Sequence, residues 1–554
     1  MVNTLKYEII DVDALGRIGK LTIGNKKMGT PNLFPVIHPY KNILSTSDLK
    51  DFGVECIFTN AYIIYQNEKL KQDVLKEGLH RYLNFDGLIA TDCGAFQQYM
   101  YNDGNNKLEI DAESIEKFQE KIGSDFPVIL DVPVQLDDDY ETAKNKVLTT
   151  ITRAKDNIKR RENKNCNWFG PIHGAKYFDL LKLSSLEMNK LDFSVYAIGG
   201  LVKLFLNYRF DIAIKILLNV KEILSPNKPI HMFGLGLPQF FSLAVACGCD
   251  LIDSAAYILY AKENRYFTVS TGTKSLDELE EFPCNCPICS KYNPKELKSF
   301  DNDLKTELLA KHNLYVSFSE LKTIRQAIRE GTLWELVEQR IRNHPNLVKA
   351  ANLIKDFRDL FEIHEKIYKN HGRLYASFES LNRPLLHRYD KRINQDYRVP
   401  KNAKFLIILP ELDVKGNISP SINKWIKYID NNQLILREHL HFAFMTEFFG
   451  IIPYELTETF PMGQYESISS SRKKDILYRE SLKKSIKFIV NYSKYYKKCG
   501  VLIPKTYINQ FNEEIDFSKN HPIHDLIKKI QLKTNLETSS FTTLDLLIQF
   551  FEKS

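Results

Sequence analysis

The sequence contains no long apolar run, no tandem repeat and no low-complexity segment. Its most apolar stretches, such as Val195–Leu206, are interrupted by Gly or Lys well short of the ~20 residues that a membrane-spanning helix needs. The opening residues carry acids and lack the apolar core of a signal peptide. We therefore predict a cytoplasmic protein with no membrane partner.

A disulfide framework is not expected either. The 554 residues include nine cysteines, and an odd number argues against a fully paired set. Three of them (Cys284, Cys286 and Cys289) lie close together, whereas the others are scattered in mostly apolar surroundings. Such surroundings are typical of buried free thiols.

The length exceeds that of one ordinary core and predicts about two to four domains. With 44% hydrophobic and 26% charged residues, the composition is that of a globular protein, and the net charge of +7 is compatible with a polyanionic partner. Lys and Arg gather in residues 472–498, where Tyr478, Tyr492, Tyr495 and Tyr496 are interleaved. This segment predicts either a solvated helix face or an RNA-contacting surface.

Eight short β-rich segments alternate with longer helical segments in the first half of the chain. Buried parallel strands are continuously apolar, as these segments are, and eight alternations favour a (β/α)8 TIM barrel over an open doubly wound sheet. Before them, residues 7–31 alternate at period two and predict a small antiparallel flap. The eight predicted strands lie within residues 31–38, 55–60, 87–92, 126–131, 167–172, 194–200, 229–234 and 249–254.

The pattern changes beyond the predicted barrel. We expect an α/β catalytic domain over residues 1–335, with a zinc-binding insertion at about 283–313. Residues 336–398 read as a polar helical connecting region. Residues 399–554 read as a C-terminal α+β accessory domain with tRNA contacts as one of its roles.

Polar and small residues follow the predicted strands, where a barrel of this kind carries its active site. Carboxylates gathered in one pocket shift one another's pKa values, so one can serve as a nucleophile and another as an acid or base. Two alternatives remain open: an Asp after a strand often only caps the next helix, and paired glycines often only form turns. The strand-end candidates are Asp92, Asp131, His173, Gly199, Gly200 and Asp253, with Phe96 as either a core residue or a stacking partner for a base.

Cys284, Cys286, Cys289 and the more distant His312 offer three thiolates and one imidazole. This is the donor set of a closed tetrahedral zinc site, and four protein ligands leave no position open for water. The alternative is a chance group of buried thiols. We predict one structural Zn²⁺ per chain, which fastens the cysteine segment to the helix that carries His312.

Several of these motifs together resemble one family, the tRNA-guanine transglycosylases. They are "TDCGAFQQY", "DVPVQLDDD", "AIGGLV" and "HMFGLGLPQFF", in this order and followed by the cysteine and histidine spacing. The segment "LLAKHNLYVSFSELKTIRQAIREGTLWELVEQRIRNHP" is similar to the archaeal branch, the archaeosine tRNA-ribosyltransferases. The likeness extends from about Leu5 to Gln395.

The resemblance implies a pentosyltransferase that exchanges guanine at position 15 of the tRNA D-arm for 7-cyano-7-deazaguanine (preQ0), in archaeosine biosynthesis. It implies that Asp253 is the nucleophile toward the ribose C1′ and that Asp92 is the acid or base; some descriptions of the family place the nucleophile at the Asp92 position. Asp131, Gly199 and Gly200 would read the edge of the base, and Phe96 would stack on its face. The family also leads us to expect a homodimer.

The chain departs from the family pattern in two ways. His173 stands in "PIHGAK" where the family usually has a base-reading Gln, so the base preference is open. The C-terminal segment lacks the Gly-punctuated β pattern of the RNA-binding PUA domain that archaeal relatives carry, and we predict that this domain is absent. RNA would then be held by the barrel rim, by residues 472–498 or by a separate RNA-binding protein. The segment "IPYELTETFPMGQYE" also resembles the family, with no role that the pattern explains.

Three rival functions are weighed against this hypothesis. An archaeosine synthase-like paralogue tends to lose the metal cysteines and the nucleophile, and a non-catalytic tRNA-binding subunit has no need of Asp92 and Asp253, whereas this chain has them all. A metal hydrolase is the weakest, because no His and carboxylate metal cluster stands at the strand ends.

Overall fold

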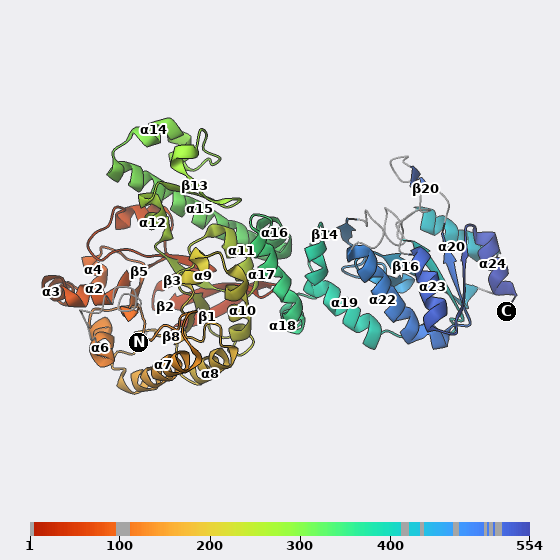
Figure 1. The fold of residues 1–554 in the computed structure, drawn as a ribbon, viewed down its shortest axis with the longest axis horizontal. Coiled ribbons are helices and arrows are strands. Elements are labelled where there is room, and N and C mark those ends of the chain that lie inside the picture. The colour runs from red at the N-terminus through yellow and green to blue at the C-terminus, as the bar shows by residue number, and fades with distance from the viewer. Residues whose placement is uncertain are drawn as a thin grey trace. The chain divides into compact units, whose positions relative to one another are not determined.

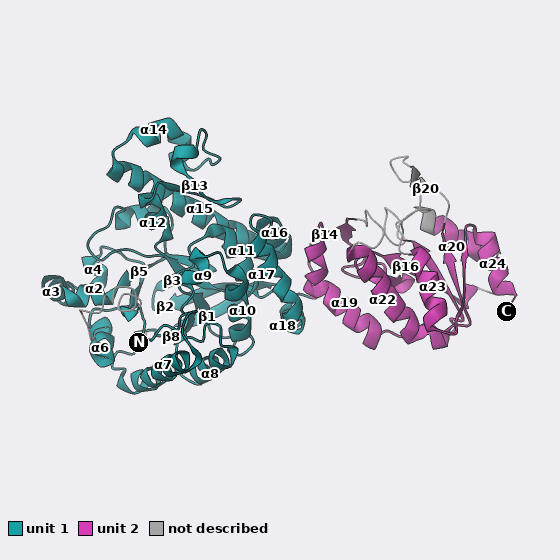
Figure 2. Cartoon of the chain, viewed as in Figure 1, with its two compact units in different colours: residues 1–366 teal, residues 367–554 magenta. Residues whose placement is uncertain are grey.

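A computed structural model describes residues 5–95, 111–410, 420–432, 437–468, 476–503, 507–508, 514–515 and 523–553. The chain divides into two compact units, residues 1–366 and 367–554 (Figure 2). Each unit has its own hydrophobic core. Within the described ranges, no helix is both long enough and apolar enough to cross a membrane.

The first unit opens with the predicted antiparallel flap. It consists of β1 (Lys6–Asp13), β2 (Gly16–Ile23) and β3 (Lys26–Thr30), which pair in this order. The prediction from the period-two pattern is confirmed.

All eight predicted strands are present, and all pair in parallel. One sheet has the order β5-β6-β7 and the other the order β4-β11-β10-β9-β8. Parallel bridges between Val36 and Phe58 and between Val128 and Phe169 link β4 to β5 and β7 to β8. Each strand therefore has a parallel neighbour on both sides. Their bounds are β4 (Asn32–Pro35), β5 (Cys56–Asn60), β6 (Leu88–Asp92), β7 (Phe126–Pro127), β8 (Phe169–Ile172), β9 (Val195–Ile198), β10 (Ile230–Met232) and β11 (Leu251–Ser254).

Helices connect these strands, and α6, α7, α8 and α10 lie outside them in Figure 1. Two of these helices start at a side-chain cap: Asp111 accepts from the backbone N–H of Ser114 before α6, and Asp139 accepts from that of Thr142 before α7. The unit is therefore mixed α/β, as predicted. The helices are α1 (Thr46–Asp51), α2 (Ala61–Gln66), α3 (Glu68–Glu77), α4 (Leu79–Tyr82), α6 (Ala112–Lys121), α7 (Tyr140–Arg160), α8 (Phe178–Asn189), α9 (Val202–Leu206), α10 (Phe210–Lys221), α11 (Pro238–Ala246) and α12 (Ala256–Lys262).

A hairpin and a long helix follow the last parallel strand. Asp301 caps the start of the 29-residue helix α15, and Gly331 ends it in the left-handed conformation with φ 71°. The segment comprises β12 (Arg265–Thr268), β13 (Gly272–Ser275), α13 (Pro287–Lys291), α14 (Pro294–Ser299) and α15 (Asn302–Glu330). Helices α16 (Leu333–Ile341), α17 (Pro345–Ala351) and α18 (Arg358–His364) complete the unit.

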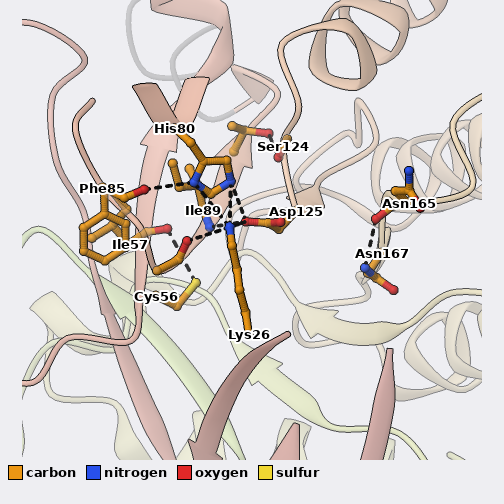
Figure 3. Close-up of polar contacts among 12 residues, drawn as sticks. Lys26, Cys56, Ile57, His80, Phe85, Ile89, Ser124, Asp125, Asn165 and Asn167 are labelled. Atoms are coloured by element: carbon orange, nitrogen blue, oxygen red, sulfur yellow. Dashed lines mark hydrogen bonds and ion pairs between the residues drawn. The ribbon is translucent and has the colours of Figure 1, made fainter. Parts of the chain in front are cut away.

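A polar cluster of Lys26, His80 and Asp125 joins the flap to the amino ends of the parallel strands (Figure 3). Lys26 Nζ lies 3.3 Å from Asp125 Oδ2 and 3.0 Å from His80 Nε2, and it donates to the carbonyl of Gly87 at 2.9 Å. His80 Nε2 lies 2.9 Å from the same carboxylate oxygen. Asp125 also accepts from the backbone N–H of Ile89 at 2.9 Å, so the cluster connects β3 to the start of β6.

The second unit is built on a mainly parallel sheet. Its strand order is β17-β16-β15-β19-β22, and only the β16–β17 pair is antiparallel. The predicted α+β character is therefore wrong, because helices α20, α22 and α23 alternate with the strands and return the chain to the same sheet edge. The strands are β15 (Phe405–Pro410), β16 (Leu440–Thr446), β17 (Gly450–Pro453), β19 (Lys498–Leu502) and β22 (Glu537–Phe541), with β14 (Arg373–Tyr375) paired to β18 (Tyr465–Ser467). The helices are α19 (Pro384–Gln395), α20 (Pro420–Asn432), α22 (Ile476–Tyr492), α23 (Ile523–Lys533) and α24 (Leu544–Glu552).

The basic, tyrosine-rich segment coincides largely with α22. Tyr478, Tyr492 and Tyr496 are buried in the second core, whereas Tyr495 is 50% exposed. Three of the four interleaved tyrosines are thus core residues, and Tyr495 is the one of the four whose ring is exposed enough to stack on a base. Residues 472–475 of the segment lie outside the described residues.

The motif at residues 452–466, which the sequence left unexplained, places the exposed Glu455 in a polar network with the buried His441. Glu455 accepts from the hydroxyl of Tyr397 and lies 3.3 Å from His441 Nε2, while His441 Nδ1 lies 2.7 Å from the hydroxyl of Tyr496. These residues come from separate elements, so the motif has a structural role in holding the second unit together.

Candidate functional site

The polar residues of the predicted site converge on the carboxyl ends of the parallel strands. Asp92 is the last residue of β6, and Asp253 lies in β11. His173 directly follows β8, and Asp131 follows the short β7. Carboxyl ends of parallel strands that pair side by side lie on one edge, so the structure gathers these residues there. Phe96 lies outside the described residues.

Asp131 and His173 form a buried pair. His173 Nε2 lies 2.6 Å from Asp131 Oδ2, and the imidazole is only 1% exposed. An ionised carboxylate only accepts hydrogen bonds, so we assign the proton on Nε2 to this contact. The carboxylate is held in a fixed orientation as a result.

Cys93 lies between two of the carboxylates. Its sulfur is 3.8 Å from Asp92 Oδ1 and 3.7 Å from Asp131 Oδ1. Burial raises the pKa of the Cys93 thiol, and the charges of Asp131 and Asp92 raise it further. The thiol therefore stays protonated and donates weakly to both acids.

Asp92 also accepts hydrogen bonds from described residues of β5 and of the loop after β6. Asn60 Nδ2, from the end of β5, donates to Asp92 Oδ2 at 2.9 Å, and the backbone N–H of Gly94 donates to Oδ1 at 3.3 Å. Sequence reasoning missed Asn60 and Cys93, although Asn60 ends a predicted strand in the same way as Asp92. The position of Asn60 at the end of a predicted strand was the signal that could have identified it as a site residue.

Gly199 provides space for the Asp131–His173 pair. A Cβ at this position would lie 2.3 Å from His173 Cε1, closer than real contacts allow. Gly200 adopts φ 75°, a left-handed conformation that favours glycine, and its Cβ would lie 2.5 Å from the carbonyl oxygen of Val134. Both glycines therefore let the loop after β9 approach His173 and the backbone of Val134 closely, so their role is more than forming a turn.

Asp253 is held by a second histidine. His231 Nε2, from β10, lies 2.7 Å from Asp253 Oδ1, and the backbone N–H of Gly234 donates to the same oxygen at 3.1 Å. His231 is fully buried. Sequence reasoning missed it, because one histidine inside an apolar strand carries no strand-end signal.

Helix capping does not account for two of the three acids. The helices that follow Asp131 and Asp253 are α7 and α12, whose N-cap residues are Asp139 and Ala255. Both carboxylates are instead bonded by histidines at the strand edge.

The predicted metal ligands also come together. Candidate ligand atoms of Cys284, Cys286, Cys289 and His312 all lie within 4.8 Å of one another. His312 Nδ1 is 3.4 Å from the sulfur of Cys286 and 3.3 Å from that of Cys289. Three thiolates and one imidazole at such distances can hold a metal ion.

The surroundings of His312 orient it for this role. His312 Nε2 lies 3.0 Å from the carbonyl oxygen of Phe267, which accepts a hydrogen bond from the Nε2–H group and leaves Nδ1 free to bind a metal. Tyr266 stacks on the imidazole at 3.7 Å between ring centroids, and its hydroxyl lies 3.2 Å from the sulfur of Cys289. The donor set and its support fit a closed metal site.

Comparison with known proteins gives consistent results. The family described as queuine tRNA-ribosyltransferase matches residues 12–346. A tRNA-guanine(15) transglycosylase of Methanocaldococcus jannaschii is 40% identical over 469 residues, covering 83% of this chain and 68% of the relative. One from Methanococcus aeolicus is 36% identical, covering 96% of this chain and 81% of the relative, and one from Pyrococcus furiosus is 41% identical, covering 70% and 65%. The resemblance seen in the sequence is confirmed: the chain belongs to the tRNA-guanine transglycosylase family of tRNA-ribosyltransferases.

Proposed function

We propose that the protein exchanges guanine at position 15 of the tRNA D-arm for preQ0, in archaeosine biosynthesis, through a covalent ribosyl-aspartate intermediate. The observation that carries this proposal is the placement of Asp92 and Asp253 at the same strand edge, each fixed by hydrogen bonds. Its relatives are named tRNA-guanine(15) transglycosylases, which supports the position of the base.

Two carboxylates divide the work of the reaction. Asp253 attacks the ribose C1′, a C1′–oxygen bond forms, and the C1′–N9 bond breaks with its electron pair moving to the base. Asp92 supplies the proton to the departing guanine and then removes one from the incoming base, whose nitrogen displaces the carboxylate of Asp253. Retaining glycosidases use two carboxylates in the same way. The target nucleotide must leave its stack to reach this edge.

The base would be recognised by the pair of Asp131 and His173 and by the backbone of Gly199 and Gly200. A carboxylate accepts from the N–H edge of guanine, and the glycines allow backbone groups to approach a flat ring. Phe96 would stack on that ring.

We interpret the eight parallel strands as a closed (β/α)8 barrel, since every strand has two parallel neighbours. The cysteine and histidine cluster would hold a structural Zn²⁺, because four protein donors complete its tetrahedral shell. In this proposal residues 1–335 form the catalytic domain, 336–398 connect, and 399–554 assist tRNA binding without a PUA domain. A homodimer, a separate RNA-binding protein and a cytoplasmic location complete the proposal.

The proposal is tested by incubating the protein with an unmodified tRNA transcript and labelled guanine or preQ0. We expect label to enter the tRNA, and we expect the Asp253→Asn variant to incorporate none. Label entry that survives Asp253→Asn would remove Asp253 from its role. Tight tRNA binding with no exchange would favour a non-catalytic subunit or an archaeosine synthase-like paralogue.

A further inference from the structure

His231 and Asp253 form a contact that the proposed reaction does not yet use. The imidazole Nε2 lies 2.7 Å from Asp253 Oδ1, and the Gly234 amide donates to the same oxygen at 3.1 Å. Among the described residues no hydrogen bond reaches the other carboxylate oxygen, Oδ2. The two oxygens of one carboxylate are therefore chemically distinct.

The surroundings of His231 are apolar. Its ring lies 5.0–5.5 Å from those of Phe233, Phe169 and Phe34, and 6.2 Å from that of Phe58, measured between centroids. The residue is 0% exposed. Burying a polar side chain among aromatic rings costs folding free energy unless the side chain makes a hydrogen bond. The hydrogen bond to Asp253 offsets this cost for His231.

The hydrogen-bonding pattern fixes the tautomer of the imidazole. Asp253 as a carboxylate can only accept, so the proton of the contact resides on His231 Nε2. Nδ1 is buried and meets no hydrogen-bonding partner among the described residues. The ring thus has one polar connection in the described structure, and it leads to Asp253.

We propose that His231 is a positioning residue for the nucleophile. It holds Oδ1, together with the Gly234 amide, so that Oδ2 faces the ribose and makes the bond to C1′. When the ester forms, Oδ1 becomes its carbonyl oxygen and keeps both hydrogen bonds. When the incoming base breaks the Oδ2–C1′ bond, the two donors stabilise the carboxylate that is released. This role rests on the proposed function of Asp253.

Four variants in the full-length chain test the role. His231→Phe suits the aromatic cage and removes the donor. His231→Gln keeps an N–H close to the position of Nε2, whereas His231→Asn carries an amide too short to reach Asp253. Asp253→Asn reports on the nucleophile itself. The measurements are kcat and KM for label exchange into an unmodified tRNA transcript, with thermal unfolding of each variant.

We expect His231→Phe to lower kcat about tenfold to a hundredfold with little change in KM, as for loss of one hydrogen bond to a charged group. His231→Gln should recover most of this loss. If His231→Phe is less stable than the wild type, the kcat values of His231→Gln and His231→Asn are compared instead. Both of these variants bury an amide, so they differ mainly in whether that amide reaches Asp253. Equal kcat for wild type, Phe and Asn, or equal kcat for Gln and Asn, would overturn the proposal. Exchange absent from the wild type, or retained by Asp253→Asn, would instead contradict the proposed function.

Discussion

Gly199 is the residue whose replacement tests the base-recognition site with the smallest change. Alanine would place a methyl group 2.3 Å from His173 Cε1, so the imidazole must shift, which disturbs its contact with Asp131. Because the contact is steric, we expect about 1–3 kcal/mol lower stability and a fall in base exchange of about tenfold to a hundredfold. Exchange kinetics and thermal unfolding measure the two effects.

Gly29 offers a matched control, because a Cβ there would meet nothing within 4 Å. Gly29→Ala should leave exchange unchanged. If Gly199→Ala exchanged as fast as Gly29→Ala, then His173 would not be part of base recognition.

At the scale of residues, strand ends were the informative positions in the sequence. Asp92, Asp131, His173 and Asp253 were predicted because each ends a strand, and the structure places them on one edge. The residues that bond to these acids were not predicted. Cys93 and His231 contact the carboxylates of Asp131 and Asp253, and these contacts depend on which strands are neighbours. Strand order around a sheet is a long-range property that one sequence pattern does not encode.

The cysteine segment and helix α15 together supply the four side chains that could hold a metal ion. Without an ion, the three thiols lose the interaction that draws the segment onto α15, so chelation should lower the stability of the first unit by on the order of 10 kcal/mol at most. Cys286→Ser removes one of the four ligands, so it should lower both the zinc bound per chain and the stability of the first unit. Metal analysis with thermal unfolding, with and without a chelator, provides the measurement.

Cys166 serves as the control for this experiment. It lies outside the cluster and donates to the carbonyl of Ser124 at 3.4 Å, a bond that serine can keep. Cys166→Ser should retain one zinc per chain. Full zinc content in Cys286→Ser would contradict the assignment of the site.

The flap is fastened to the parallel strands by Asp125, which gives its stability a pH dependence. Burial alone would raise the pKa of Asp125, but hydrogen bonding and charge from His80, the charge of Lys26 and the amide of Ile89 outweigh it and lower the pKa below its ordinary 3.8. A depressed folded-state pKa stabilises the protein above the ordinary value and loses this effect as the pH falls through the folded-state pKa.

We therefore expect Asp125→Asn to cost about 1–3 kcal/mol at pH 7, through loss of its bonds as a charged group. The difference from the wild type should shrink as the pH falls below about 4, because Asp125 becomes protonated first in the unfolded chain and then, at lower pH, in the folded protein. Urea unfolding at a series of pH values measures both. A difference that stays constant from pH 7 to pH 3 would show that the charge of Asp125 contributes nothing.

At the scale of elements, the eight strands and the flap could be predicted, because continuous apolar runs and period-two alternation are local signals. The parallel sheet of the second unit could not. Its strand β15 is a continuous apolar run, but partners such as β19 are far away in the sequence. The burial of Tyr478 and Tyr492 on α22 could not be predicted for a related reason: periodicity does not say which face of a helix is covered.

For the whole molecule, the net charge of +7 has a natural partner in tRNA. Lys483, Lys487 and Lys494 are exposed on or beside α22. If they contact phosphates, changing all three to Gln should weaken tRNA binding at low salt. It should also reduce the slope of log affinity against log salt by about 2, because fewer counterions are released.

The same substitution of Lys155, Lys159 and Lys190 provides a control with an equal change of net charge. These lysines are exposed on α7 and beside α8 in the first unit. Equal salt slopes for the two triple variants would mean that the α22 lysines form only a solvated face.

The proposed covalent intermediate on Asp253 can be tested directly by mass spectrometry. The protein is mixed with unmodified tRNA without an incoming base, denatured, and digested with ribonuclease and protease. We predict a ribonucleotide fragment lacking its base, attached to the peptide that contains Asp253. The same mass on the peptide with Asp92, or exchange without a covalent mass on either peptide, would contradict the proposed mechanism.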